Sequence, residues 1–218
     1  MNAIVTINYK LPEWSEITLR RMAEYAERIG VKLHVAKPEY YRSFVDRAPL
    51  FLVALGQYDR VALIDADCVI SREAPNIFEH DPGRVWMVPD CKEGEINKRW
   101  LPQMVTMQAI FGSIGWFEGY GNFGVTLVEP NHADAFSNWH DIQDVNHDQT
   151  CFNYNIRKYR YDLGWLERRW NSMAITLGLH DELESVSAMA NGAYIAHTAG
   201  FRKEIRQTAI EELDKLMP

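Results

Sequence analysis

The stretch Tyr58-Asp59-Arg60-Val61-Ala62-Leu63-Ile64-Asp65-Ala66-Asp67 decides the fold. Its four apolar residues, from Val61 to Ile64, predict a buried strand that two aspartates follow. Residues two apart on an extended chain point to the same side, so Asp65 and Asp67 are expected to converge. Two neighbouring carboxylates repel unless a proton or a cation lies between them. At the carboxyl end of a strand in an open α/β sheet, we expect a divalent cation that holds phosphates. The alternative is a turn capped by Asp65 beside a solvated Asp67.

The first third of the chain predicts alternating strands and helices. Residues 3–7 are a β-branched run, and Val31, Leu33 and Val35 alternate with polar residues as a second strand. Apolar residues recur at helical spacing over residues 13–29, and a second helix is expected over residues 42–55. This order predicts a parallel sheet with right-handed crossovers. The expected fold class is therefore α/β, with a Rossmann-like, mostly parallel central sheet flanked by helices.

The remainder of the chain is less regular. Residues 85–88, 125–128 and 193–196 predict strands, and residues 149–158 and 203–217 predict helices. Residues 90–120 mix charges, tryptophans and glycines, so we expect an irregular segment there, a candidate for a mobile acceptor or lid loop. No repeat, linker or low-complexity tract is found, and residues 1–218 are interpreted as a single domain.

The composition is that of a globular protein with a formal net charge of −7, which gives no general attraction to nucleic acid or anionic membranes. Cys68, Cys91 and Cys151 have no short paired spacing, which favours a reducing compartment over a zinc knuckle or a disulfide framework. There is no signal-peptide pattern and no apolar run long enough to span a bilayer. The expectation is a cytoplasmic protein without a transmembrane segment.

Two competing motifs are weak. Gly119, Gly121 and Gly124 form a literal Gly-x-Gly-x-x-Gly, but a strand follows it where a dinucleotide site needs a helix, and the sequence has no P-loop. A second possible metal cluster consists of His140, Asp144, His147 and Asp148. An exposed polar helix face explains that cluster equally well. For the aspartate pair, His197 is a candidate third ligand because it directly follows a late strand, although a lone histidine there is more often structural.

At this point the chain resembles the glycogenin-like retaining glycosyltransferases, a family with the GT-A fold that includes bacterial lipopolysaccharide sugar transferases. The segment 58–67 is similar to the family's metal-binding Asp-x-Asp segment. Four further matches follow in the family's order: Asn122-Phe123-Gly124-Val125-Thr126-Leu127, Asp148-Gln149 with Asn153, Trp170-Asn171, and His197-x-x-Gly200-x-x-Lys203. Phe123 replaces the family's usual small residue, and Glu204-Ile205 replaces its usual Pro-Trp. The matches span nearly the whole chain.

The resemblance implies a GT-A-type domain with a nucleotide-binding half, residues 1–70, and a donor-sugar and acceptor half, residues 71–218. It implies a hexosyl- or pentosyltransferase that uses a nucleoside-diphosphate sugar, in the first place a UDP-sugar, and retains the anomeric configuration. One Mn²⁺ or Mg²⁺ would be held by Asp65, Asp67 and His197. Asp148 and Gln149 would be catalytic. Donor-binding residues would be Asn8, Tyr9, Arg47, Asp65, Ala66, Asn122, Gly200 and Lys203.

The acceptor stays open. Trp170 and Asn171 resemble a pair near the family's acceptor side, and mixtures of cations and aromatics such as Lys98-Arg99-Trp100 suit carbohydrates, phosphates or bases. A glycan, a glycolipid, a protein or a modified nucleic acid fits this pattern. Two alternative functions are a nucleotidyltransferase that makes nucleotide sugars and a non-catalytic nucleotide-sugar-binding protein. The absence of glycine from Asn8-Tyr9-Lys10-Leu11-Pro12 counts against the first, and the intact acidic and histidine residues count against the second.

Overall fold

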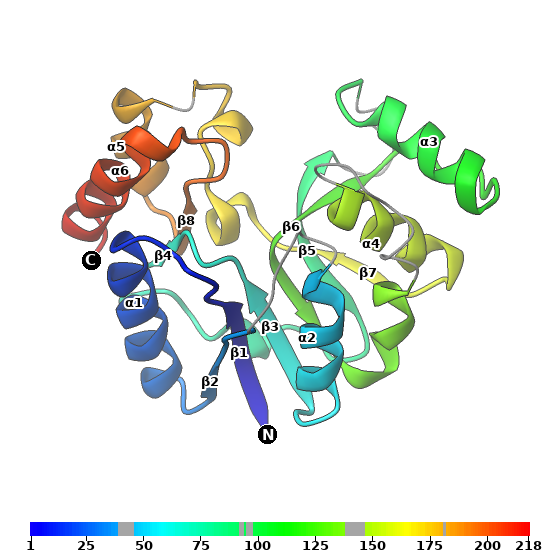
Figure 1. Ribbon diagram of the computed structural model, residues 1–218, viewed down its shortest axis with the longest axis horizontal. Helices are drawn as coiled ribbons and strands as arrows, with labels where there is room; N and C mark the ends of the chain where they lie inside the picture. The colour runs from blue at the N-terminus through cyan, green and yellow to red at the C-terminus, as the bar shows by residue number, and fades with distance from the viewer. Residues whose placement is uncertain (39–45, 92–93, 95–97, 138–146, 181) are drawn as a thin grey trace.

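A central sheet of six strands organises the molecule, seen in a computed structural model that describes residues 1–38, 46–91, 94, 98–137, 147–180 and 182–218 (Figure 1). Its strand order is β2-β1-β3-β6-β5-β7. Only β6 runs antiparallel to its neighbours β3 and β5, and the other neighbouring pairs are parallel. The strands are β1 Asn2–Ile7, β2 Lys32–Ala36, β3 Arg60–Ile64, β5 Val85–Cys91, β6 Tyr120–Val128 and β7 Leu163–Trp165. The predicted α/β fold with a mostly parallel sheet is confirmed.

A second, two-stranded sheet extends from the end of β3. Its strands, β4 Cys68–Ile70 and β8 Ile195–His197, are antiparallel. Helices lie on both sides of the sheets: α1, α5 and α6 on the left of Figure 1, and α2, α3 and α4 on the right. The helices are α1 Trp14–Arg28, α2 Arg47–Leu55, α3 Leu101–Phe111, α4 His147–Lys158, α5 Val186–Ala190 and α6 Lys203–Leu216. Short 3-10 turns occur at Ile77–Glu79, Pro130–Phe136, Arg168–Asn171, Ile175–Leu177 and Leu183–Ser185.

The apolar run of β3 is continuous because both faces of the sheet are covered. Val61 and Leu63 pack into a core shared with α2, α3 and α4, whereas Ala62 and Ile64 pack into a second core shared with α1. A strand that is buried on both faces keeps no polar alternation, which explains the sequence pattern. A third core lies between β4, β8, α5 and α6.

Most predicted elements are found within one to five residues of their expected ends. The described part of the second predicted helix begins at Arg47, and residues 42–45 lie outside the described residues. The strand expected at residues 125–128 begins earlier, at Tyr120, so it contains Gly121 and Gly124. Among the described residues, no helix combines the length and apolar character that crossing a bilayer requires.

The expectation of an irregular segment over residues 90–120 was wrong for its middle part, which forms α3. Pro102 lies in the first turn of α3, where its missing N–H and fixed φ are tolerated. Gly112, with a φ of 103°, ends the helix in a conformation that other residues rarely adopt. The helix escaped prediction because Leu101–Phe111 has no charged residue to mark a polar face.

Candidate active site

The aspartate pair lies where the main sheet passes into the two-stranded sheet. Asp65 directly follows β3, and its backbone N–H donates to the carbonyl oxygen of Gly124 in β6 (2.9 Å). Asp67 directly precedes β4. Both ends of the turn are therefore fixed by strand hydrogen bonding, which limits the movement of the two carboxylates.

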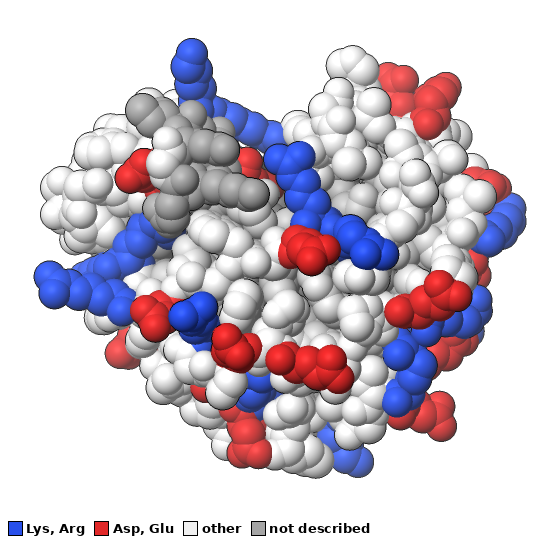
Figure 2. Space-filling model, turned by 180° about the vertical axis from the view of Figure 1, so that it is seen from behind, with Lys and Arg blue, Asp and Glu red and all other residues white. Residues whose placement is uncertain are grey.

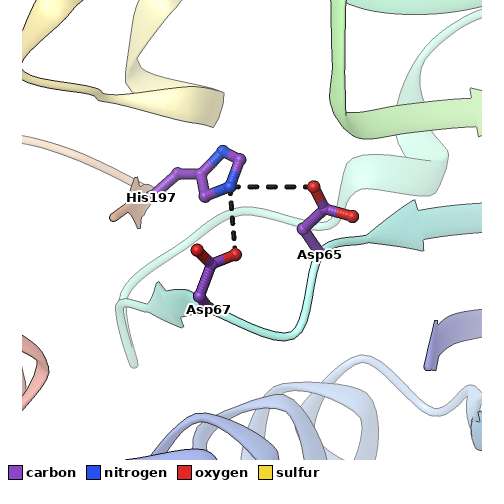
Figure 3. Close-up of side chains that lie close together, drawn as sticks. All are labelled: Asp65, Asp67 and His197. Atoms are coloured by element: carbon purple, nitrogen blue, oxygen red, sulfur yellow. Dashed lines mark hydrogen bonds and ion pairs between the residues drawn. The ribbon is translucent and has the colours of Figure 1, made fainter. Parts of the chain in front are cut away.

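His197 reaches the aspartates through the pairing of β4 with β8, in which Cys68 stands opposite His197. The His197 Nε2 atom lies 3.1 Å from Asp67 Oδ1 and 3.7 Å from Asp65 Oδ2 (Figure 3). One ligand atom from each of the three residues lies within 4.8 Å of the others. Two carboxylate oxygens and an imidazole nitrogen are a donor set that suits Mn²⁺, and Mg²⁺ accepts the carboxylates. The predicted ligands thus converge on one point.

A chain of amides sets the protonation of His197. The backbone N–H of Gly124 donates to Asn122 Oδ1 (2.8 Å), which also accepts from Asn171 Nδ2 (2.8 Å). Because Asn171 donates through Nδ2, its Oδ1 accepts from His197 Nδ1 (2.9 Å). The ring proton of neutral His197 is therefore held at Nδ1, and the Nε2 lone pair faces the two carboxylates. This is the tautomer that a metal ligand requires.

Gly124 leaves the space that the imidazole occupies. A Cβ built at this position would lie 2.4 Å from His197 Cε1 and 2.6 Å from His197 Nδ1. Gly124 also accepts the Asp65 N–H and donates to Asn122, so one residue touches three parts of the site. The reason for glycine here is close packing, since Gly124 has no positive φ.

The charges around His197 and Asp67 stabilise one another. Burial opposes charge on both side chains, but the Asp67 and Asp65 carboxylates raise the pKa of His197 above its usual value. His197 and Arg206 in turn lower the pKa of Asp67 well below its usual range, again against burial. A proton on Nε2 or a divalent cation would each balance the carboxylates at this place.

Arg206 is a site residue that the sequence analysis missed. Its Nη1 atom lies 3.6 Å from Asp67 Oδ2, and Nη2 donates to the carbonyl oxygen of Phe201 (2.8 Å). Among the described residues, the buried Nε has no hydrogen-bond partner, although the side chain lines the pocket. Lys203, chosen by the motif, is exposed and does not line the pocket. The signal that was available is the position of Arg206 one turn later on the same predicted helix.

Arg47 connects the aspartate pair with the start of α4. Its Nη1 atom lies 3.0 Å from Asp65 Oδ1 and 3.6 Å from Asp148 Oδ2. The other oxygen of Asp148 accepts the backbone N–H of Gln149 (2.8 Å). Burial raises the pKa of Asp148, and the Arg47 guanidinium opposes this shift.

Asp90, at the end of β5, is a second residue that the sequence analysis missed. Burial raises its pKa to about 6, although hydrogen bonds from Asn122, Gln149 and Trp100 and the charge of Arg99 oppose the shift. Gln149 is held in turn, because its Oε1 accepts the backbone N–H of Phe123 (3.0 Å). No sequence motif marks Asp90, and only the sheet order brings it beside Asn122.

These side chains line one pocket with a volume of about 500 Å³, in the range of small-molecule sites. Of the predicted site residues, those in the pocket wall are Tyr9, Arg47, Asp65, Ala66, Asp67, Asn122, Asp148, Gln149, His197 and Gly200. Four others are not part of the wall: Asn8, Lys203, Trp170 and Asn171. Trp170 packs against Tyr194 and His80 in the core, and Asn171 supports His197 from behind.

The two competing motifs have different outcomes. Gly121 and Gly124 lie inside β6 and do not open a helix, so the glycine motif is not a dinucleotide loop, as predicted. In the other cluster, His140 and Asp144 lie outside the described residues. Asp148 of that cluster contacts Arg47 in the pocket.

Comparison with models of protein families and with curated proteins finds no match. Solved structures do match. A glycosyltransferase involved in the glycosylation of the major capsid of PBCV-1 has a TM-score of 0.64 at 12% identity, covering 97% of this chain and 98% of that one. The galactosyltransferase LgtC, in complex with donor and acceptor sugar analogs, has a TM-score of 0.54 at 13% identity, covering 99% and 96%.

The bifunctional glycosyltransferase WbbM has a TM-score of 0.57 at 11% identity, and the match covers 99% of this chain and 50% of that one. At sequence identities of 11–13%, structural similarity shows a shared fold and no more. Together with the strand order and the flanking helices, these matches confirm the fold that the sequence motifs predict: the chain has the GT-A-type fold of these glycosyltransferases.

Proposed function

We propose that this protein is a metal-dependent glycosyltransferase. It moves a hexosyl or pentosyl group from a nucleoside-diphosphate sugar, in the first place a UDP-sugar, to an acceptor hydroxyl, and it retains the anomeric configuration. The observation that carries the proposal is the convergence of Asp65, Asp67 and His197 on one wall of a pocket in a glycosyltransferase fold. These residues come from segments about 130 positions apart, so their convergence is a property of the fold.

The donor set fits one Mn²⁺ or Mg²⁺. His197 has the tautomer that offers Nε2, and both carboxylates face the same point. When bound, such an ion supplies Lewis-acid stabilisation of the charge that grows on a departing diphosphate. Asn171 and Asn122 would orient His197 from behind, as partners of metal-bound histidines commonly do.

Arg206 is proposed as the cation for the diphosphate, in place of Lys203. An arginine presents several N–H groups. Here Nη2 donates to Phe201, while the buried Nε finds no partner in the part of the chain that the structure describes. A phosphate oxygen in the pocket would accept the hydrogen bond of Nε. Its negative charge would also replace part of the attraction between Asp67 and the guanidinium. Gly200, which has a φ of 89°, lines the pocket beside it.

The two halves of the chain are proposed to divide the donor between them. Tyr9 would stack on the nucleotide base, and Arg47 would contact a phosphate or the donor sugar. From residues 71–218, Asn122, Asp148 and Gln149 would line the sugar. The Arg47 contacts with Asp65 and Asp148 support this arrangement, because they couple the metal side of the pocket to the sugar side.

For the chemical step we propose same-face attack, in which the leaving phosphate helps to deprotonate the acceptor hydroxyl. Asp148 is a carboxylate on the proposed sugar side of the pocket. Its contacts with Arg47 and with the N–H of Gln149 suit an electrostatic role. It would stabilise the positive charge of the sugar together with Gln149. Transfer that stays intact in Asp148→Asn would exclude Asp148 from the mechanism.

The proposal is tested with the purified full chain, Mn²⁺ and a panel of nucleotide sugars. We expect release of free nucleoside diphosphate from one donor, its loss with a chelator, and its return with Mn²⁺. Addition of a simple glycoside acceptor then allows the anomeric configuration of the product to be read by NMR. The matched control is Asp81→Asn, since Asp81 is exposed and lies outside the pocket wall.

The outcomes separate the three functions. Diphosphate release that needs Mn²⁺ and Asp67 supports the transferase. Formation of a nucleoside triphosphate from nucleotide sugar and pyrophosphate identifies a nucleotidyltransferase. Thermal stabilisation by a nucleotide sugar without turnover over the whole panel identifies a binding protein.

A further inference from the structure

The segment from Trp100 to Phe117 contains no charged residue and no histidine, in a protein of which 24% is charged. It forms α3 and the turn after it. One face of α3 packs on α4, and its Met104 and Met107 are buried in the core that the two helices share. Gln108 is also buried and bonds the turn that follows α3. The opposite face points away from the rest of the molecule, at the upper right of Figure 1.

The exposed side of α3 and of the turn after it carries large apolar side chains. The exposed fractions are 48% for Val105, 55% for Ile110, 38% for Ile114 and 46% for Phe117. We call these four residues the α3 patch. Single exposed apolar residues are ordinary, but four of them on one uncharged helix and turn mark an interaction surface.

Basic residues border the α3 patch at both ends. Lys98 and Arg99, both exposed, directly precede the helix. At its other end, the Tyr154 hydroxyl donates to the carbonyl oxygens of Phe111 and Gly112, and Lys158 lies over the Tyr154 ring (5.8 Å). Arg160 follows and is also exposed. Figure 2 shows this end of the molecule, at the upper left, as largely uncharged, with both basic and acidic side chains around it. Glu118 is the one acidic residue that directly adjoins the segment.

We propose that the α3 patch docks the protein on an anionic lipid surface. Apolar side chains that enter the headgroup region, flanked by lysine and arginine at the level of the phosphates, are the chemistry of interfacial helices. A second copy of the chain fits less well, because face-to-face packing would bring like charges together at both ends of the patch. The overall charge of −7 does not oppose this docking, since screening limits its reach to about 10 Å.

The α3 patch lies close to one side of the pocket. Arg99 and Trp100, the two residues before α3, line the pocket wall, and Trp100 stacks on Tyr120 (4.9 Å, 5°). A lipid surface bound at α3 would therefore lie at the pocket's α3 side. If the proposed transfer is correct, a lipid-linked acceptor could enter from there. The docking itself does not depend on that activity.

The test is sedimentation of the full chain with vesicles of phosphatidylcholine, alone or with 30% phosphatidylglycerol. We expect binding to the anionic vesicles to be roughly tenfold or more tighter than to the neutral ones, and to weaken as salt is raised. The double variant Ile110→Ser, Phe117→Ser should lower the affinity by about tenfold or more, because both apolar side chains leave the interface. Lys158→Ala should lower it by about fivefold on anionic vesicles only.

The matched control is the double variant Leu52→Ser, Val53→Ser on α2. These residues are also exposed, at 39% and 56%, but lie outside the α3 patch. Circular dichroism and thermal melting confirm that each variant folds. Failure of the wild type to bind either vesicle at low salt overturns the proposal, as does unchanged binding by the α3 variant. A dimer in solution that only the α3 variant dissociates would also overturn it, in favour of a second copy. None of these readouts uses catalysis, so they fail or succeed independently of the proposed function.

Discussion

The two walls of the pocket hold partly buried aspartates in opposite electrostatic environments. On the first wall, Asp67 faces His197 and Arg206, and these cations lower its pKa in spite of burial. On the second wall, Asp90 is surrounded by the amides of Asn122 and Gln149, and burial raises its pKa to about 6. We call these the cation wall and the amide wall. The same side chain is thus held ionised on one side of the pocket and takes up a proton near pH 6 on the other.

The comparison teaches what decides the charge of a buried carboxylate. Amides satisfy hydrogen bonds but do not offset the cost of removing a charge from water, whereas a nearby cation does. On the cation wall, the carboxylates and the cations beside them stabilise one another's charged forms. On the amide wall, Asp90 gains or loses a proton near pH 6.

The largest effect is expected from breaking the cation wall with Asp67→Asn. The substitution removes one proposed metal ligand and leaves His197 and Arg206 without their main counter-charge. We expect transfer activity to fall about 10³-fold, since a metal ligand supports several kcal/mol of transition-state stabilisation. We expect Mn²⁺ to raise the melting temperature of the wild type by binding the folded state, and not to raise that of the variant. Activity within tenfold of wild type would contradict the metal site, with Asp81→Asn as the unchanged control.

The second prediction compares two basic residues of α6. Arg206→Gln should lower kcat/KM about 10- to 100-fold, the value of one charge-assisted hydrogen bond to phosphate. Lys203→Gln should change it less than threefold, because Lys203 is exposed and outside the pocket wall. The measurement is steady-state kinetics with the donor that the panel identifies. The reverse order of effects would restore Lys203 as the phosphate ligand.

A third prediction concerns the packing behind the cation wall. Gly124→Ala places a methyl group where the His197 ring lies, so the imidazole must move away from the carboxylates. We expect the affinity for Mn²⁺ to fall 10- to 100-fold, as when the partners of a ligand are disturbed. Calorimetric titration measures this. Gly56→Ala is the matched control, because a Cβ at Gly56 meets its nearest atom at an ordinary 3.5 Å. Equal affinities in the two variants would show that His197 is not a ligand.

Part of the cation wall can be predicted from the sequence, and part cannot. The apolar run from Val61 to Ile64 predicts its strand because burial on both faces leaves a continuous pattern. The resemblance then selects His197, and the structure brings it to the aspartates through the pairing of β4 with β8. That pairing joins residues about 130 positions apart and has no local signature. The convergence of Asp65 and Asp67 could be predicted from the local sequence. Their contact with His197 could be predicted only from the family resemblance or seen in the fold.

Two differences between the sequence pattern and the structure have a common physical origin. Lys203 and Arg206 are three residues apart on one helix, and the motif favours the first. Which cation faces the pocket is set by how α6 packs on β4 and α5, as the bond from Arg206 to Phe201 reflects. Helix α3 was missed because its outer face is apolar, so it lacks the polar stripe of an ordinary surface helix. In both cases the position of a residue in the folded protein, and not its local pattern, decides the outcome.

The smallest effect is expected on the amide wall, and it is a dependence of stability on pH. Because the pKa of Asp90 is about 6 in the folded protein and 3.8 in a model peptide, the folded state binds the proton more tightly. The contribution of the protonated form to stability is complete below about pH 4 and is lost as the pH rises through 6. The loss is at most about 3 kcal/mol, and less where the carboxyl is open to the pocket.

Asp90→Asn keeps the shape and hydrogen bonding of the neutral carboxyl but cannot ionise. We therefore expect the variant to gain stability over the wild type at pH 7.5, by about 1 to 2 kcal/mol, and to match it at pH 3.5. Urea unfolding at the two pH values measures the difference. Asp81→Asn, at an exposed carboxylate, should show no such difference between the two pH values. A stability gain of the same size at both pH values would mean that the substitution acts through packing. The contrast between the two walls would then rest on the cation wall alone.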